Sequence, residues 1–174
     1  MFTYDNALEI ATEAHKNQKN RSGGLYVDYL KAVVRDLQEA QEPEDVLIVA
    51  ILQDIMGEST HYTTEKLNEL GVPQNILEII SLLTHRKDQA FIDSYSCDLM
   101  ASAMPAEEAT YEAREKEYLL YIDKLKKNNI AKKVKTTATR VLLSEDFLPK
   151  NQRREKKNKY RIQKYEAALK KLEE

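Results

Sequence analysis

The chain is poor in the residues on which other fold classes depend. Its 174 residues include one cysteine, no tryptophan, four glycines and four prolines. The single cysteine, Cys97, excludes an intrachain disulfide and a thiolate metal cluster. So few glycines and prolines leave little material for the tight turns of a β-rich protein, and the abundance of Leu, Glu, Lys and Ala favours helices. We therefore expect an all-α protein.

No stretch is apolar over the roughly 20 residues that a membrane-spanning helix needs, and the N-terminal residues lack the pattern of a signal peptide. The net charge of −2 and the pI near 6.0 argue against bulk binding to nucleic acid. With 42% hydrophobic residues, the chain is too apolar to be disordered and long enough to bury a core. These features predict one cytoplasmic domain over residues 1–174, with no nucleic-acid or membrane partner.

The longest apolar run, from Val46 to Leu52, is the segment around which we expect the fold to form. Pro43 and the two carboxylates after it suit the first turn of a helix, where proline is tolerated and negative charge meets the positive end of the helix dipole. The run predicts a central helix over 42–56, buried on all sides. Gln53 and Asp54 follow on the same predicted helix, where polar side chains must find partners or line a cavity.

Apolar residues at helical spacing predict about seven or eight helices in total, including a C-terminal helix at about 155–174. Residues 86–105 break this pattern, because they have no clean period and contain many small residues. We expect an irregular insertion there. Its Met and Phe content makes contact with a partner, or with a second copy of the chain, a reasonable hypothesis.

Several motifs, taken in order, make the chain resemble the HD-domain family, and within it the small alarmone hydrolases related to the hydrolase domain of RelA/SpoT proteins. The matching segments are AHKNQ at 14–18, NRSG at 20–23, YVDYL at 26–30, LQDIMGES at 52–59, LTHR at 83–86 and VK at 134–135. The 24 residues from Tyr29 to Gln53 equal the family spacing between its two histidines. The resemblance implies an HD-domain helical bundle and covers most of residues 4–146.

The same resemblance implies that the family's metal site is degenerate here. Family members hold one divalent cation, typically manganese, with two histidines and two aspartates. Tyr29 and Gln53 stand at the histidine positions, Asp54 is retained, and the second aspartate falls on Ala138 or Thr139. A phenol, an amide and one carboxylate are a poor ligand set for a divalent ion. We expect no metal and no other cofactor.

The residues that would orient the attacking water are also incomplete. The family's Glu-Asp pair is replaced by Gly57 and Glu58. We therefore expect no catalytic residue and interpret the chain as a probable pseudoenzyme of the HD phosphohydrolases.

The cations of the family's binding loop and of the helix facing it are partly retained. The expected ligand-binding residues are Arg21, Ser22, Tyr29, Gln53, Asp54, Glu58, Lys135 and Arg140. Such a site suits an anion held by charge-assisted hydrogen bonds better than the cleavage of that anion. The plain alternative is that these lysines and arginines are simply solvated.

Three functions follow from these observations. The first is an inactive HD-domain protein that binds a phosphorylated nucleotide, such as a signalling nucleotide, and sequesters it without cleavage. The second is a residual or altered nucleotide phosphohydrolase that uses Asp54, Glu58 and His61. The third is an interaction protein that forms homo-oligomers through residues 86–105.

Overall fold

The computed structural model describes residues 1–57, 60–149 and 155–174, and in these residues it contains nine helices and no strand. The helices are α1 (Tyr4–Ala14), α2 (Tyr26–Glu39), α3 (Glu44–Leu52), α4 (Thr64–Glu69), α5 (Gln74–Leu83), α6 (Gln89–Ala101), α7 (Ala106–Leu125), α8 (Asn129–Leu143) and α9 (Glu155–Glu173). The all-α prediction is confirmed. The count exceeds the predicted seven or eight because the segment expected to be irregular contributes α6.

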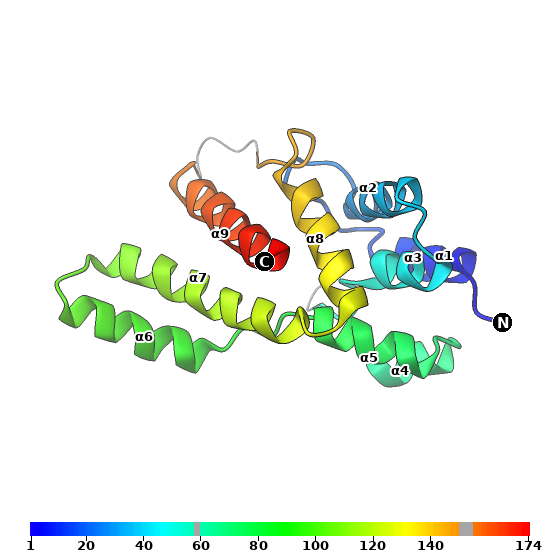
Figure 1. Cartoon of the computed structure of the whole chain (residues 1–174), viewed down its shortest axis with the longest axis horizontal. Coiled ribbons are helices and arrows are strands. Elements are labelled where there is room, and N and C mark those ends of the chain that lie inside the picture. The colour runs from blue at the N-terminus through cyan, green and yellow to red at the C-terminus, as the bar shows by residue number, and fades with distance from the viewer. Residues whose placement is uncertain (58–59, 150–154) are drawn as a thin grey trace.

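Helix α3 lies at the centre of the main body, and α1, α2, α5 and α8 pack against it (Figure 1). Helices α6 and α7 form a hairpin that extends to one side of this body. Helix α9 packs against both α7 and α8, so it joins the hairpin to the body.

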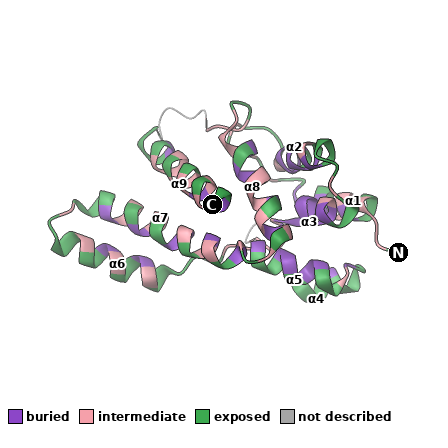
Figure 2. Cartoon of the chain, viewed as in Figure 1, coloured by how far each residue is buried: buried purple, intermediate pink, exposed green. Residues whose placement is uncertain are grey.

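The apolar run of α3 is buried as predicted, and Figure 2 shows the helix almost entirely in the colour of buried residues. Within the run, Leu47 alone is partly exposed. The helix is shorter than the predicted 42–56, because it ends at Leu52 and the chain turns. The amide of Gly57 donates to the carbonyl oxygen of Asp54 at 3.1 Å within this turn.

The prediction that Gln53 and Asp54 continue the buried helix is therefore wrong. Gln53 caps α3, and Asp54 lies in the turn that follows. A Cβ atom at position 57 would lie 3.1 Å from the Asp54 carbonyl oxygen, so glycine suits this close approach. The turn directs Asp54 out of the core, and its side chain is partly exposed.

The prediction of an irregular insertion over 86–105 is corrected by α6. The Asp88 carboxylate caps this helix by accepting a hydrogen bond from the Phe91 amide at 3.0 Å. Only Ile92 and Ser96 are buried on α6, which packs against α7. The buried side of α6 is narrow and includes a polar residue. Its sequence therefore shows little of the apolar periodicity by which a helix is predicted. Contact of this segment with a partner or a second copy stays a prediction.

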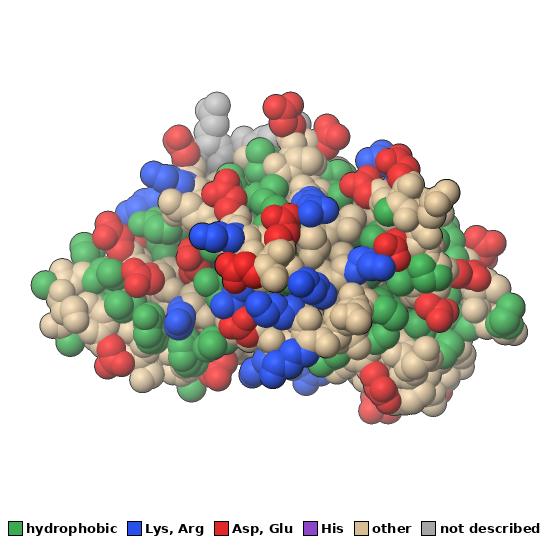
Figure 3. Space-filling view, in the orientation of Figure 1, with side chains coloured by type: hydrophobic (Ala, Val, Ile, Leu, Met, Phe, Trp, Pro, Cys, Tyr) green, Lys and Arg blue, Asp and Glu red, His purple; other side chains and the backbone are tan. Residues whose placement is uncertain are grey.

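The surface mixes both signs of charge, in keeping with the net charge of −2. On the face shown in Figure 3, lysines and arginines gather toward the middle with carboxylates among them. In the described part of the chain, no helix combines the length and the apolar character needed to cross a bilayer.

Because α3 is covered on every side, a cavity in it should be costly. We expect Ile51→Ala, at a fully buried position, to lower the free energy of unfolding by about 2–4 kcal/mol. Leu82→Ala, at a position 42% exposed on α5, is the control and should change it by less than about 1 kcal/mol. Urea denaturation measures both, and equal effects would contradict the central role of α3.

Candidate functional site

The positions that correspond to the family's metal ligands meet where α2, the end of α3 and α8 come together. Tyr29 on α2 is 3% exposed, and its hydroxyl donates to the carbonyl oxygen of Ala138 on α8 at 3.5 Å. Gln53, Ala138 and Thr139 are each 1% exposed. The phenol of Tyr29 thus packs inside the region where the aligned histidine would bind a cation.

Asp54, the acidic residue retained from the motif, has a neutral partner. The hydroxyl of Tyr26 donates to Asp54 Oδ2 at 2.7 Å. Burial, followed by the negative charge of Asp54, raises the pKa of Tyr26 well above its ordinary value, so the phenol stays protonated as a donor. The Tyr26 ring also contacts the rings of His15 and Tyr29, with centroids 4.9 and 5.5 Å away.

The remaining polar side chains at the aligned positions bond to nearby backbone carbonyls. The amide nitrogen of Gln53 donates to the Ala50 carbonyl at 3.1 Å, and the Thr139 hydroxyl donates to the Lys135 carbonyl at 2.7 Å. Among the described residues, no group of three or more His, Cys, Asp or Glu is placed to hold a metal ion. The donor set of Tyr29, Gln53 and Asp54 therefore does not fit the divalent cation of the family.

Two lysines and three tyrosines lie beside this position, and we call them the lysine–tyrosine cluster. Its members are Lys135 on α8, Tyr118 and Tyr121 on α7, and Lys164 and Tyr165 on α9.

Lys135 and Lys164 share one aromatic ring within the cluster. The Lys135 and Lys164 ammonium groups lie 5.8 and 4.7 Å from the centroid of Tyr118. Lys135 also lies 5.4 Å from the Tyr121 centroid, and Lys164 lies 5.2 Å from the Tyr165 centroid. Aromatic faces attract cations, which lets two like charges occupy this partly buried place.

The two ammonium groups differ in their electrostatic surroundings. Burial lowers the pKa of Lys135, but nearby tyrosines and the Asp54 carboxylate outweigh it and hold that pKa above its ordinary value. Burial lowers the pKa of Lys164 to about 8, and four neighbouring cations act in the same direction. These cations are Arg161, Arg21, Lys135 and Lys87.

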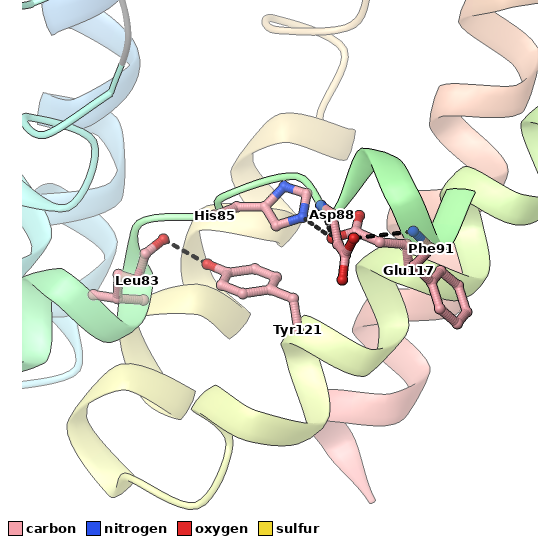
Figure 4. A network of polar contacts seen from close by, with 6 residues as sticks. All are labelled: Leu83, His85, Asp88, Phe91, Glu117 and Tyr121. Atoms are coloured by element: carbon pink, nitrogen blue, oxygen red, sulfur yellow. Dashed lines mark hydrogen bonds and ion pairs between the residues drawn. The ribbon is translucent and has the colours of Figure 1, made fainter. Parts of the chain in front are cut away.

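A hydrogen-bonded network fixes the start of the α6–α7 hairpin beside the cluster (Figure 4). His85 Nε2 lies 3.0 Å from both carboxylate oxygens of Glu117, and the Asp88 amide donates to Glu117 Oε1 at 3.1 Å. Tyr121 donates its hydroxyl to the Leu83 carbonyl at 2.5 Å. Burial lowers the pKa of His85 despite the attraction of Glu117, so at neutral pH the imidazole acts as a neutral N–H donor.

The structure brings only some of the predicted ligand-binding residues together. Arg21 is exposed, but its charge acts on Lys164. The Ser22 hydroxyl donates to Asn20 Oδ1 at 2.8 Å, within the loop itself. Arg140 is exposed, and its Nη2 lies 2.7 Å from Glu173, so it does not join the cluster. Glu58 lies outside the described residues.

Sequence reasoning did not include Tyr26, Lys164 and Arg161 in the site. Tyr26 begins the YVDYL motif that identified Tyr29, and its position three residues earlier on α2 was the available signal. Lys164 and Arg161 lie in a basic C-terminal segment, for which the sequence predicted only a helix at about 155–174. Its charge alone gave no sign that one face of α9 packs on α7 and α8.

The helix order and the meeting of these motif positions define the class: the chain has the HD-domain fold of the alarmone hydrolases. A similar solved structure is described as a metazoan ortholog of SpoT that hydrolyses ppGpp and plays a role in starvation responses. Its TM-score is 0.62 at 19% sequence identity, and the match covers 98% of this chain and 91% of that chain. No family model and no curated protein matches the chain.

The lowered pKa of Lys164 has a consequence for stability. Because the folded protein disfavours the ammonium, we expect Lys164→Met to raise the free energy of unfolding at pH 7 by roughly 2–3 kcal/mol. The gain should vanish near pH 10.5, where the unfolded lysine also loses its charge. Lys159→Met, at an exposed position of the same helix, is the matched control. Thermal unfolding at the two pH values measures the effect, and a destabilised Lys164→Met at pH 7 would refute it.

Proposed function

We propose that this chain binds a phosphorylated nucleotide beside the lost metal position and releases it uncleaved. The observation that carries the proposal is the group of five cations that includes Lys164. Like charges gathered at a partly buried place repel one another, and an anion relieves that repulsion. A phosphate group supplies both the charge and the oxygen acceptors that lysine and arginine need.

The fold supports a nucleotide as the source of that phosphate. The similar solved structure is described as hydrolysing ppGpp, which is a phosphorylated nucleotide. Arg21 retains the basic character of the loop that contacts phosphate and base in the resembling family. The ligand contacts in this proposal are Arg21, Lys135, Lys164 and Arg161. Tyr29 and Gln53 are too deeply buried to be main contacts, and in this proposal they fill the metal position.

Cleavage is disfavoured in this proposal because, among the described residues, the polar side chains at the aligned metal positions already have hydrogen-bond partners. Asp54 accepts a hydrogen bond from a neutral phenol, and the side chain of Gln53 is bound to the Ala50 carbonyl. A catalytic metal would lower the pKa of its bound water, and the donors at this position do not fit one. Sequestration of the nucleotide is the use that such a site allows.

The first test is calorimetry on a panel of guanosine and adenosine polyphosphates and cyclic nucleotides, followed by chromatography after incubation with Mn²⁺. We expect at least one member to bind and to be recovered intact. The absence of binding to every member would overturn the proposal. Manganese-dependent turnover would instead support the residual phosphohydrolase.

Two exposed arginines provide a matched pair of variants. Arg21→Ala should weaken nucleotide binding roughly tenfold to a hundredfold, because a charge-assisted contact contributes about 1.5–3 kcal/mol. Arg140→Ala removes an equal charge that is paired with Glu173 and should change the Kd by less than about threefold. Calorimetry on both variants at one salt concentration measures the difference. Equal losses would show that only the overall charge matters.

A further inference from the structure

Lys164 is approached by charged and titratable groups from every element packed around it. Tyr118 lies on α7, Lys135 on α8, and Arg161 and Tyr165 on α9 itself. Arg21 acts on it from the loop before α2, and Lys87 acts from the segment between α5 and α6, where the charge of Lys164 in turn acts on His85. His85 in turn holds Glu117. The Lys164 ammonium is therefore surrounded chiefly by cations and phenols.

Two lysines elsewhere on the surface show what carboxylate compensation looks like in this protein. Lys171 lies 3.0 Å from Asp123, and Lys133 lies 2.6 Å from Glu42. Over residues 1–57, 60–149 and 155–174, no carboxylate lies within 4.0 Å of the Lys164 ammonium, and the nearest aromatic faces are those of Tyr118 and Tyr165. A ring face is a weaker counterpart for an ammonium than a carboxylate is. The charge of Lys164 is therefore the least compensated of these three.

We propose that Lys164 makes nucleotide binding proton-linked: its amine lies over the rings of Tyr118 and Tyr165 with no carboxylate partner among the described residues, and it takes up a proton from solvent when a phosphate group binds. This inference deepens the proposed function and rests on it. It names the nucleotide's phosphate as the group that Lys164 recognises and solvent pH as a regulator of the site.

The direction of the effect follows from the same electrostatics. In the empty site, burial and then the neighbouring cations lower the pKa of Lys164 to about 8. A phosphate near the amine introduces negative charge and raises that pKa again. Below pH 8 the lysine is already charged, and binding costs no proton. Above pH 8 the binding of each nucleotide also requires Lys164 to take up a proton from solvent. Because protons become scarcer as the pH rises, the affinity falls.

Three titratable neighbours of Lys164 keep the same charge over the pH range of this effect. Burial lowers the pKa of His85, so its imidazole is already neutral there. Burial raises the pKa of Tyr118, and the net effect of the surroundings holds the pKa of Lys135 above its ordinary value, so neither changes its charge in this range. The nucleotide's phosphate has lost its second proton well below pH 8, because that pKa is about 6.

The experiment is calorimetry on the tightest-binding nucleotide of the panel between pH 7 and 9.5, in buffers of different ionisation enthalpy. We expect the Kd to be nearly constant up to about pH 8 and then to rise by up to about tenfold per pH unit, with proton uptake approaching one per nucleotide. Lys164→Arg keeps a positive charge at every pH used, so its Kd should stay nearly flat. This variant also controls for ionisation of the nucleotide and of other groups.

A second variant separates charge from shape. Lys164→Met keeps much of the apolar stem and should bind weakly at every pH, with no proton uptake. The inference is overturned if the wild type binds at pH 7 with a flat profile, or if Lys164→Arg shows the same slope as the wild type. Failure of every nucleotide to bind at pH 7 instead overturns the proposed function, and this inference with it. The two failures are thus distinguished by the measurement at pH 7 alone.

Discussion

The burial of α3 on all sides is the constraint on which the rest of the structure depends. A helix with no polar face must be covered by its neighbours, and α1, α2, α5 and α8 provide that cover. Beyond its acidic first turn, the helix meets polar residues only where it ends, at Gln53 and Asp54. The candidate site therefore lies where the apolar run stops. Helices α2 and α8 both cover the run and contribute to this site, whereas α7 and α9 supply the rest of the lysine–tyrosine cluster.

A buried tyrosine fills the junction of α2 and α8 in the candidate site. Tyr29 bridges α2 to the backbone of α8, a junction at which the resembling family places a shared cation. Tyr26 supplies the proton donor that Asp54 would otherwise lack. Both contacts join elements through protein groups, the first linking α2 to α8 and the second linking α2 to the turn after α3. The positive charge of this region comes from side chains of α8, of α9, of the loop before α2 and of the segment between α5 and α6.

Much of the fold could be predicted because it depends on local patterns. The apolar run of α3 and the spacing of motifs from Ala14 to Lys135 predicted the buried centre and the HD-domain fold. Helix α6 was missed because its buried side carries so little apolar surface.

The site was only partly predictable, because it depends on which distant segments meet. Arg140 and Lys164 look alike in sequence as basic residues on amphipathic helices. Tertiary packing directs Arg140 to Glu173 and Lys164 to the ring of Tyr118. No local pattern distinguishes these two outcomes, since each is decided by the placement of α9.

The cation group joins parts of the chain that are far apart in sequence, because Arg21 precedes α2 and Lys164 lies on α9. Contacts of such long sequence separation require a large loop to close, which costs conformational entropy. We therefore expect them to form late in folding. Partly folded chains should thus lack the complete site even where α3 is already covered. A ligand bound as proposed would join the loop before α2 to α9, so it would stabilise the completed fold over partly folded chains and over states in which α9 has opened.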